Sequence, residues 1–245
     1  MARRLLDRQV SLLAHLTSGA TIFDDNDSAA RDPALQGIDR SLLRLEACFS
    51  HEKRMEKIIA VFPRTFDVLG EHKATVIRQF TQACPPDDIS RLVNARQFCD
   101  FLSSSEQRNL LPPYLADVAA CEFACLRVRT AIEEQDDGRE NDNAPRSRKE
   151  IRRSRAVALL LCEYDVRSVF EAGARMSAPE KRKTPLAVVM RRRAGGPQIC
   201  EVLPIVFEVL TALDDWTSPT ALGETPAAKE LIADLLDHRL IEARQ

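Results

Sequence analysis

Glycine and aromatic residues are scarce in this chain of 245 residues, which contains 8 glycines and 5% aromatic residues. So few glycines argue against a glycine-rich phosphate-binding loop, and the sequence contains neither a GxxxxGKS/T nor a GxGxxG motif. No apolar run approaches the roughly 20 residues that a membrane-spanning helix needs. The N-terminus is basic and amphipathic but lacks the continuous apolar stretch of a secretion signal. We therefore expect a soluble cytoplasmic protein without a membrane partner.

The chain also lacks an excess of charge of either sign. Lys and Arg number 35 against 37 Asp and Glu, which gives a formal net charge of −2. Domains that bind nucleic acid are usually strongly basic, so this balance argues against general nucleic-acid binding while leaving a local basic patch open. The seven cysteines form no CxxC pair, which favours free thiols in a reducing compartment.

Motifs for catalysis and metal binding are missing as well. The chain has no GxSxG motif, and HEKRME at 51–56 is not HExxH because Met55 stands at the position of the second His. Cys121 and Cys125 share one helix face, but they lie on an apolar stripe where a free cysteine behaves as a small hydrophobic residue. We expect no catalytic residue, no metal site and no cofactor in this chain.

Helical spacing dominates the first half of the sequence. Ile38, Leu42, Leu45 and Phe49 are spaced 4, 3 and 4 residues apart, which predicts one apolar face of a helix. Pro63 is expected to interrupt that helix, since proline cannot donate a backbone hydrogen bond. The predicted helices cover 4–16, 37–62, 76–84, 89–102 and 112–132, and 17–36 is a predicted loop. We interpret 1–132 as a helical domain.

Composition changes abruptly after this domain. Residues 133–149 contain almost no large apolar group and are predicted to be a flexible linker. Beyond it, extended apolar patterns predict strands at 156–162, 185–193 and 198–203, the last two joined by a hairpin through Gly195 and Gly196. Helices are predicted from Pro204 and Pro226, with a short strand at 240–241. The fold class is therefore α+β: an all-α N-terminal domain, then a small winged-helix-like domain over 150–245 with a three-stranded antiparallel sheet.

Two features of the second domain could serve binding. The basic runs 181–183 and 191–193 flank a predicted strand, where they could meet phosphate or an acidic peptide, or could simply protect a sheet edge from aggregation. Trp216, the only tryptophan, follows a helix, and we expect it to fill the core.

Three stretches resemble a known family. These are FPRTFDVLGEH at 62–72, PPYLADVAACEFACLRV at 112–128 and RRSRAVALLLCEYDVRSVFEAG at 152–173. They are similar to the MbnC-type family of helical proteins, often described as DNA-binding, that are encoded beside multinuclear iron enzymes. The resemblance extends over 37–245 apart from the linker.

This resemblance implies a function in methanobactin biosynthesis, the making of a copper chelator. Its members form a heterodimer with an MbnB-like TIM-barrel iron enzyme. Together the two proteins act on a cysteine of an MbnA-like ribosomal precursor peptide, using oxygen to form an oxazolone and a neighbouring thioamide. The resemblance places the iron in the partner subunit. It implies that the helical domain 1–132 docks on that subunit and that the smaller domain binds the leader peptide.

A leader peptide could add a strand to an exposed edge of the small sheet. The candidate edge residues are Val188, Met190 and Arg192 on one strand, or Ile199, Glu201 and Leu203 on the other. The residues alone do not decide which strand is the edge. Two alternatives remain: a winged-helix DNA-binding transcriptional regulator, supported by the basic runs, and a stand-alone enzyme that uses its cysteines.

Overall fold

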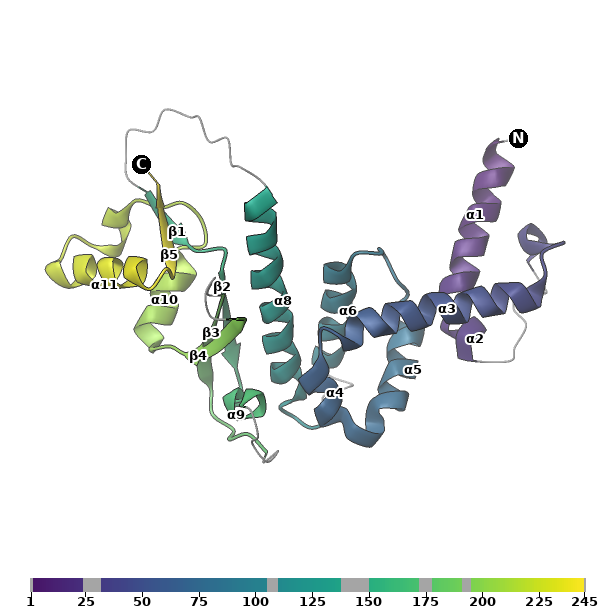
Figure 1. Cartoon of the computed structure of the whole chain (residues 1–245), viewed down its shortest axis with the longest axis horizontal. Coiled ribbons are helices and arrows are strands. Elements are labelled where there is room, and N and C mark those ends of the chain that lie inside the picture. The colour runs from purple at the N-terminus through teal and green to yellow at the C-terminus, as the bar shows by residue number, and fades with distance from the viewer. Residues whose placement is uncertain are drawn as a thin grey trace. The chain divides into compact units, whose positions relative to one another are not determined.

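The computed structural model describes residues 2–23, 32–104, 110–137, 150–171, 178–190 and 195–244 (Figure 1). It divides the chain into two compact units, Met1–Ala119 and Ala120–Gln245. No helix in these ranges combines the length and apolar character needed to cross a membrane. The predicted fold class is confirmed, because helices form the N-terminal part and a three-stranded antiparallel sheet lies in the C-terminal part.

The N-terminal unit is built from helices, and half of those described begin where the sequence offers a cap or a proline. The Asp39 carboxylate accepts hydrogen bonds from the first turn of α3, and Pro63 occupies the first turn of α4. The elements are α1 (Ala2–Thr17), α2 (Gly19–Phe23), η2 (Pro33–Leu35), α3 (Arg40–Ile59), α4 (Pro63–Leu69), η3 (Gly70–His72), α5 (Lys73–Ala83) and α6 (Arg91–Ser103).

Aromatic rings form the centre of this unit. Phe98 of α6 is fully buried, and its ring centroid lies 5.2 Å from that of Phe62, 5.4 Å from that of Phe66 and 5.1 Å from that of Phe80. Such tilted and stacked pairs add to the free energy gained by burying the rings. A protein with few aromatics thus concentrates several of them where α4, α5 and α6 meet.

The predicted loop over 17–36 is wrong in part. Residues Gly19–Phe23 form the short helix α2, while residues 24–31 lie outside the described residues. A Cβ atom built on Gly19 would lie 2.9 Å from Gln82 of α5, so the absent side chain lets the two backbones approach closely. Glycine is typical of loops, but Gly19 serves helix packing, which local sequence does not reveal.

The sheet of the C-terminal unit has the strand order β2-β3-β4, with both pairs antiparallel. The predicted hairpin joins β3 to β4, although residues 191–194 lie outside the described part of the chain. The elements of this unit are α8 (Leu115–Asp137, which begins just before it), β1 (Glu150–Arg153), β2 (Val157–Cys162), α9 (Arg167–Phe170), β3 (Thr184–Met190), β4 (Pro197–Glu201), α10 (Pro204–Ala212), η4 (Pro219–Leu222), α11 (Pro226–Asp237) and β5 (Ile241–Arg244).

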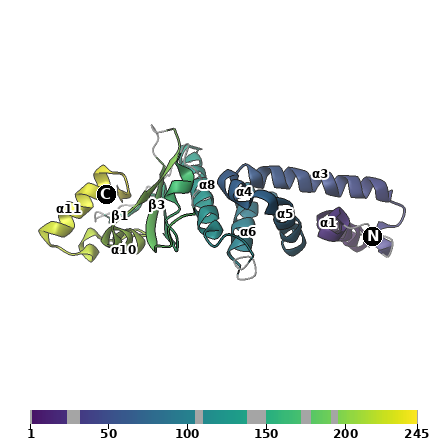
Figure 2. The same ribbon diagram turned by 90° about the horizontal axis from the view of Figure 1, so that it is seen from below.

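Helices cover both faces of the sheet. Ala124 and Val128 of α8 pack against Ala158 and Val188 on one face, and Figures 1 and 2 show α10 on the opposite side. The sequence assigned residues up to 132 to the helical domain and 133–149 to a linker. The structure instead continues α8 to Asp137 and groups most of it with the sheet, because its apolar stripe is buried there. Residues 138–149 are not among the described residues.

A second, two-stranded sheet pairs β1 with β5. It covers a core of Ile151, Leu210, Leu213, Leu235 and Ile241, contributed by these strands together with α10 and α11. The sequence predicted a short strand near 240–241 but not β1. The segment that forms β1 contains one apolar residue, Ile151, among charged residues, and this pattern gives no strand signal.

Trp216 lies beside the second sheet. The expectation that Trp216 fills the core is wrong. Its ring is half-buried, and the guanidinium groups of Arg152 and Arg244 lie over it at 4.3 Å and 4.2 Å from the ring centroid. The tryptophan therefore makes cation–π contacts with two arginines of the second sheet.

Candidate peptide-binding edge

The strand order decides which of the two candidate edges exists. Val188 and Met190 lie on β3, which is paired on both sides, and Val188 is fully buried. These two residues are therefore not on a sheet edge, and Arg192 lies outside the described residues. Ile199 and Glu201 lie on the outer strand β4, and Leu203 directly precedes α10.

The register shows which backbone groups of β4 remain available. In an antiparallel pair, alternate residues direct both N–H and C=O toward the neighbouring strand. The Val202 N–H donates to the Pro185 carbonyl at 3.0 Å, so residues 198, 200 and 202 are the ones bonded to β3. The N–H and C=O of Ile199 and Glu201 consequently face away from the sheet. No strand among the described residues pairs with them.

The side chains along this edge differ in character. Ile199 packs against the α8 face of the sheet, next to Val188 and Ala158. Leu203 and Ile205 follow the strand with 68% and 57% of their surface exposed, although both are large and apolar. The edge thus ends beside exposed apolar surface that an added peptide could cover.

Four charged residues fix this same end of the edge, where β4 finishes at Glu201. Glu201 accepts hydrogen bonds from Arg182 Nη1 at 2.6 Å and forms an ion pair with Arg167 Nη2 at 2.7 Å. Asp165 accepts from Arg167 Nε at 2.8 Å and from Arg182 Nη2 at 2.7 Å. Each carboxylate therefore contacts both guanidinium groups, and the four side chains form a closed network. Sequence reasoning noted the basic run 181–183 but missed this network, whose partners lie up to 36 residues apart.

The network is charged throughout the physiological pH range. The hydrogen bond from Arg167 holds the pKa of Asp165 well below its usual range, and the hydrogen bond from Arg182 lowers the pKa of Glu201. Groups that stay ionised in this way are poor general acids or bases at neutral pH. Their arrangement instead orients β4 against β3 and the segment that precedes it.

Three cysteines on α6 and α8 are buried or half-buried. Burial raises the pKa of the Cys125 thiol to about 11 and that of Cys99 to about 12, so both are protonated at neutral pH. Cys121 is fully buried, as its place on the apolar stripe predicts. The described ranges also contain no group of three His, Cys, Asp or Glu side chains placed to hold a metal ion.

No protein-family model matches this sequence, and none of the curated proteins matches it either.

Proposed function

We propose that this chain is a non-catalytic partner subunit that binds the leader of a ribosomal precursor peptide and presents it to an iron enzyme. The resemblance of three stretches to MbnC-type proteins suggests an MbnB-like iron enzyme as the partner. In that setting the complex would oxidise a peptide cysteine to an oxazolone and a thioamide during methanobactin biosynthesis. The observation that carries the proposal is the outer edge of β4, where the backbone groups of Ile199 and Glu201 face away from the sheet.

A peptide that adds a strand here would form backbone hydrogen bonds to Ile199 and Glu201, and these give affinity with little dependence on sequence. Its side chains would alternate between the α8 face and the opposite face of the sheet. Leu203 and Ile205 offer apolar contact where β4 ends. Holding the leader in this way raises the local concentration of the reacting cysteine at the partner's metal.

The DNA-binding alternative has less support. A recognition helix needs cations along the face that meets DNA. In α11 a single cation, Lys229, stands against Glu230, Asp234 and Asp237. A steep loss of DNA affinity with rising salt would contradict the peptide-binding proposal and favour a regulator.

The first test is co-expression with the neighbouring iron enzyme, followed by purification through a tag on one subunit. We expect both proteins to elute together in a stable complex. Separate elution at micromolar concentration would contradict the partner role.

The second test removes a backbone donor from the β4 edge. Glu201→Pro deletes an N–H that faces outward, so the bonds between β4 and β3 stay intact, whereas Glu201→Ala loses the same carboxylate but keeps the N–H. We expect Glu201→Pro to weaken binding of a fluorescently labelled precursor peptide about tenfold more than Glu201→Ala does, as measured by anisotropy.

The opposite edge of the sheet supplies the matched control. Leu161 on β2 is half-exposed and its N–H also faces away from β3. Leu161→Pro should therefore leave peptide affinity unchanged. Loss of binding in Leu161→Pro, with normal binding in Glu201→Pro, would assign the peptide to β2 and contradict the proposal for β4.

A further inference from the structure

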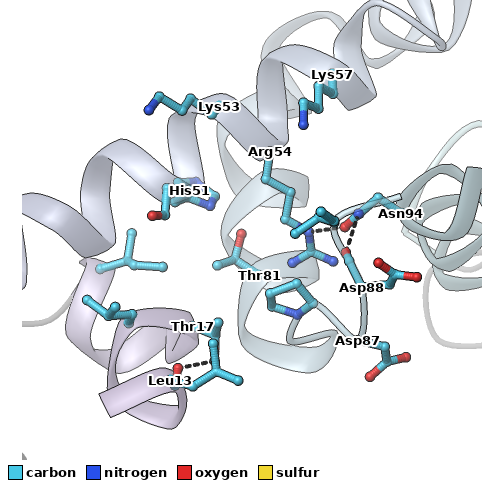
Figure 3. Close-up of a pocket in the computed structure, with 15 residues that line it drawn as sticks. Leu13, Thr17, His51, Lys53, Arg54, Lys57, Thr81, Asp87, Asp88 and Asn94 are labelled. Atoms are coloured by element: carbon cyan, nitrogen blue, oxygen red, sulfur yellow. Dashed lines mark hydrogen bonds between the residues drawn. The ribbon is translucent and has the colours of Figure 1, made fainter. Parts of the chain in front are cut away.

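A cavity of about 510 Å³ lies in the N-terminal unit, between α1, α2, α3 and the loop that precedes α6 (Figure 3). Its size falls within the range of sites for small molecules. Much of its wall is apolar, provided by Leu13, Leu16, Ile22, Pro86 and Ile89. Of these, Ile89 is 90% exposed, so it stands at the mouth of the cavity rather than in the core.

A half-buried cation faces this apolar space. Arg54 of α3 lies over the ring of Phe80, at 4.7 Å from the ring centroid. Its Nε donates to Asn94 Oδ1 at 2.7 Å, and its Nη1 donates to the Cys84 carbonyl at 2.8 Å. Its Nη2 donates to Gln97 Oε1 at 2.9 Å. All three acceptors are neutral, so no carboxylate accepts a hydrogen bond from the guanidinium, and the nearby Asp87 attracts it only through space.

The charge of Arg54 is incompletely compensated. A guanidinium has five N–H donors, so two of them, one on each Nη atom, make no hydrogen bond to the described residues. Removing a charge from water without a counter-ion is costly. Burial accordingly lowers the pKa of Arg54. The site therefore favours the arrival of an anion.

Two further cations stand on the same helix. Lys53 and Lys57 line the cavity one turn apart, are exposed, and have no hydrogen-bond or ion-pair partner among the described residues. The acidic residues of the cavity are less available. Asp87 accepts from Gln97 Nε2 at 2.5 Å, and in Figure 3 the Asp87 and Asp88 carboxyl groups lie on the side away from Leu13.

We propose that this cavity binds a small amphipathic carboxylate. The carboxylate accepts the two remaining N–H groups of Arg54, whose planar fork suits two parallel hydrogen bonds. Lys53 and Lys57 add attraction at the entrance, and the hydrocarbon body of the ligand covers Leu13 and Ile89. This site lies in the N-terminal unit and does not rest on peptide binding at β4.

The test uses decanoate as the probe and titration calorimetry of the full chain as the readout. We expect one decanoate per chain. Decanol and decyltrimethylammonium have the same tail without the negative charge, and each should bind at least about tenfold more weakly. Equal affinity for either compound, or no heat from decanoate at about 1 mM, would overturn the proposal.

Substitutions at the mouth of the cavity test the position of the charge. Ile89→Asp places a carboxylate in the lining where it competes with the ligand, and Ile89→Asn has nearly the same shape without the charge. Because Ile89 is so exposed, both variants should keep the fold, which circular dichroism would verify. We expect decanoate affinity to fall at least about tenfold in Ile89→Asp and to stay within about threefold in Ile89→Asn. Equal affinities would overturn the proposal.

The lysines are tested by a second matched pair. The double substitution Lys53→Gln and Lys57→Gln removes two charges from the cavity, and Lys73→Gln with Lys229→Gln removes two exposed charges elsewhere. The double variant at Lys53 and Lys57 should bind decanoate about three- to tenfold more weakly. The double variant at Lys73 and Lys229 should bind decanoate as the parent protein does. An equal loss of decanoate affinity in the two double variants would overturn the proposed location.

Discussion

The network at the end of β4 gives a sharp prediction for Asp165→Asn. The Asp165 side chain is only 16% exposed and accepts from Arg167 Nε at 2.8 Å, from Arg167 Nη2 at 2.6 Å and from Arg182 Nη2 at 2.7 Å. Hydrogen bonds to a charged group contribute roughly 1.5–3 kcal/mol. Asparagine keeps one acceptor and Glu201 still contacts both arginines, so we expect the free energy of unfolding to fall by about 1–2 kcal/mol.

The assay is urea unfolding at pH 7, followed by the fluorescence of Trp216. This residue is the only tryptophan and lies in the same unit as Asp165. Glu163→Gln serves as the control, because Glu163 is exposed and has no partner among the described residues. An unfolding free energy of Asp165→Asn within about 0.3 kcal/mol of the parent protein would refute the role of the network.

The same substitution also gives a prediction for how the free energy of unfolding depends on pH. The pKa of Asp165 is lower in the folded protein than in the unfolded chain, where it is about 3.9. Its contribution to stability is therefore complete above that value and is lost as the pH falls toward the folded pKa. The difference between the parent protein and Asp165→Asn should stay constant from pH 7 to about 5 and shrink below about 4. A difference at pH 2.5 as large as the difference at pH 7 would show that charge is not its origin.

Three further outcomes test the packing of the protein. Phe98→Ala should lower the free energy of unfolding by about 3–5 kcal/mol in a denaturant titration, because Phe98 is fully buried against three other rings. Gly19→Ala should lower the thermal midpoint, whereas Gly196→Ala, with no atom within 4 Å of its new Cβ, should not, and equal midpoints would contradict the close approach of α2 to α5. Cys200 is exposed and should react quickly with a thiol reagent at pH 8, while Cys99, whose pKa burial raises to about 12, should react only after unfolding. Fast labelling of Cys99 in the native protein would contradict its burial.

Much of the local structure could be predicted from the sequence because its signals are local. Pro63 and Pro204 each begin a helix because proline fixes φ and its missing N–H is not needed in the first turn. The continuous apolar runs at 157–162 and 184–190 indicate strands buried between two helical layers. These patterns depend on residues a few positions apart, and a single sequence contains them in full.

The wrong predictions concern residues whose deciding neighbours are far away in the sequence. Gly19 indicates a loop by composition, and its use in packing α2 against α5 depends on Gln82, more than 60 residues later. Trp216 looks like a core residue, but in the structure its ring contacts the guanidinium groups of Arg152 and Arg244. In each case the deciding neighbour is distant in sequence, so no local pattern could predict it.

The sequence by itself determined where the longer helices and the three strands of the larger sheet form and that the chain is α+β, because backbone propensity and apolar spacing act within a few residues. Only the tertiary structure decided that β3 is central and β4 is an edge, since strand order depends on which distant segments pair. It alone also left Arg54 beside an apolar cavity with neutral partners, because those partners come from segments that fold together only in three dimensions.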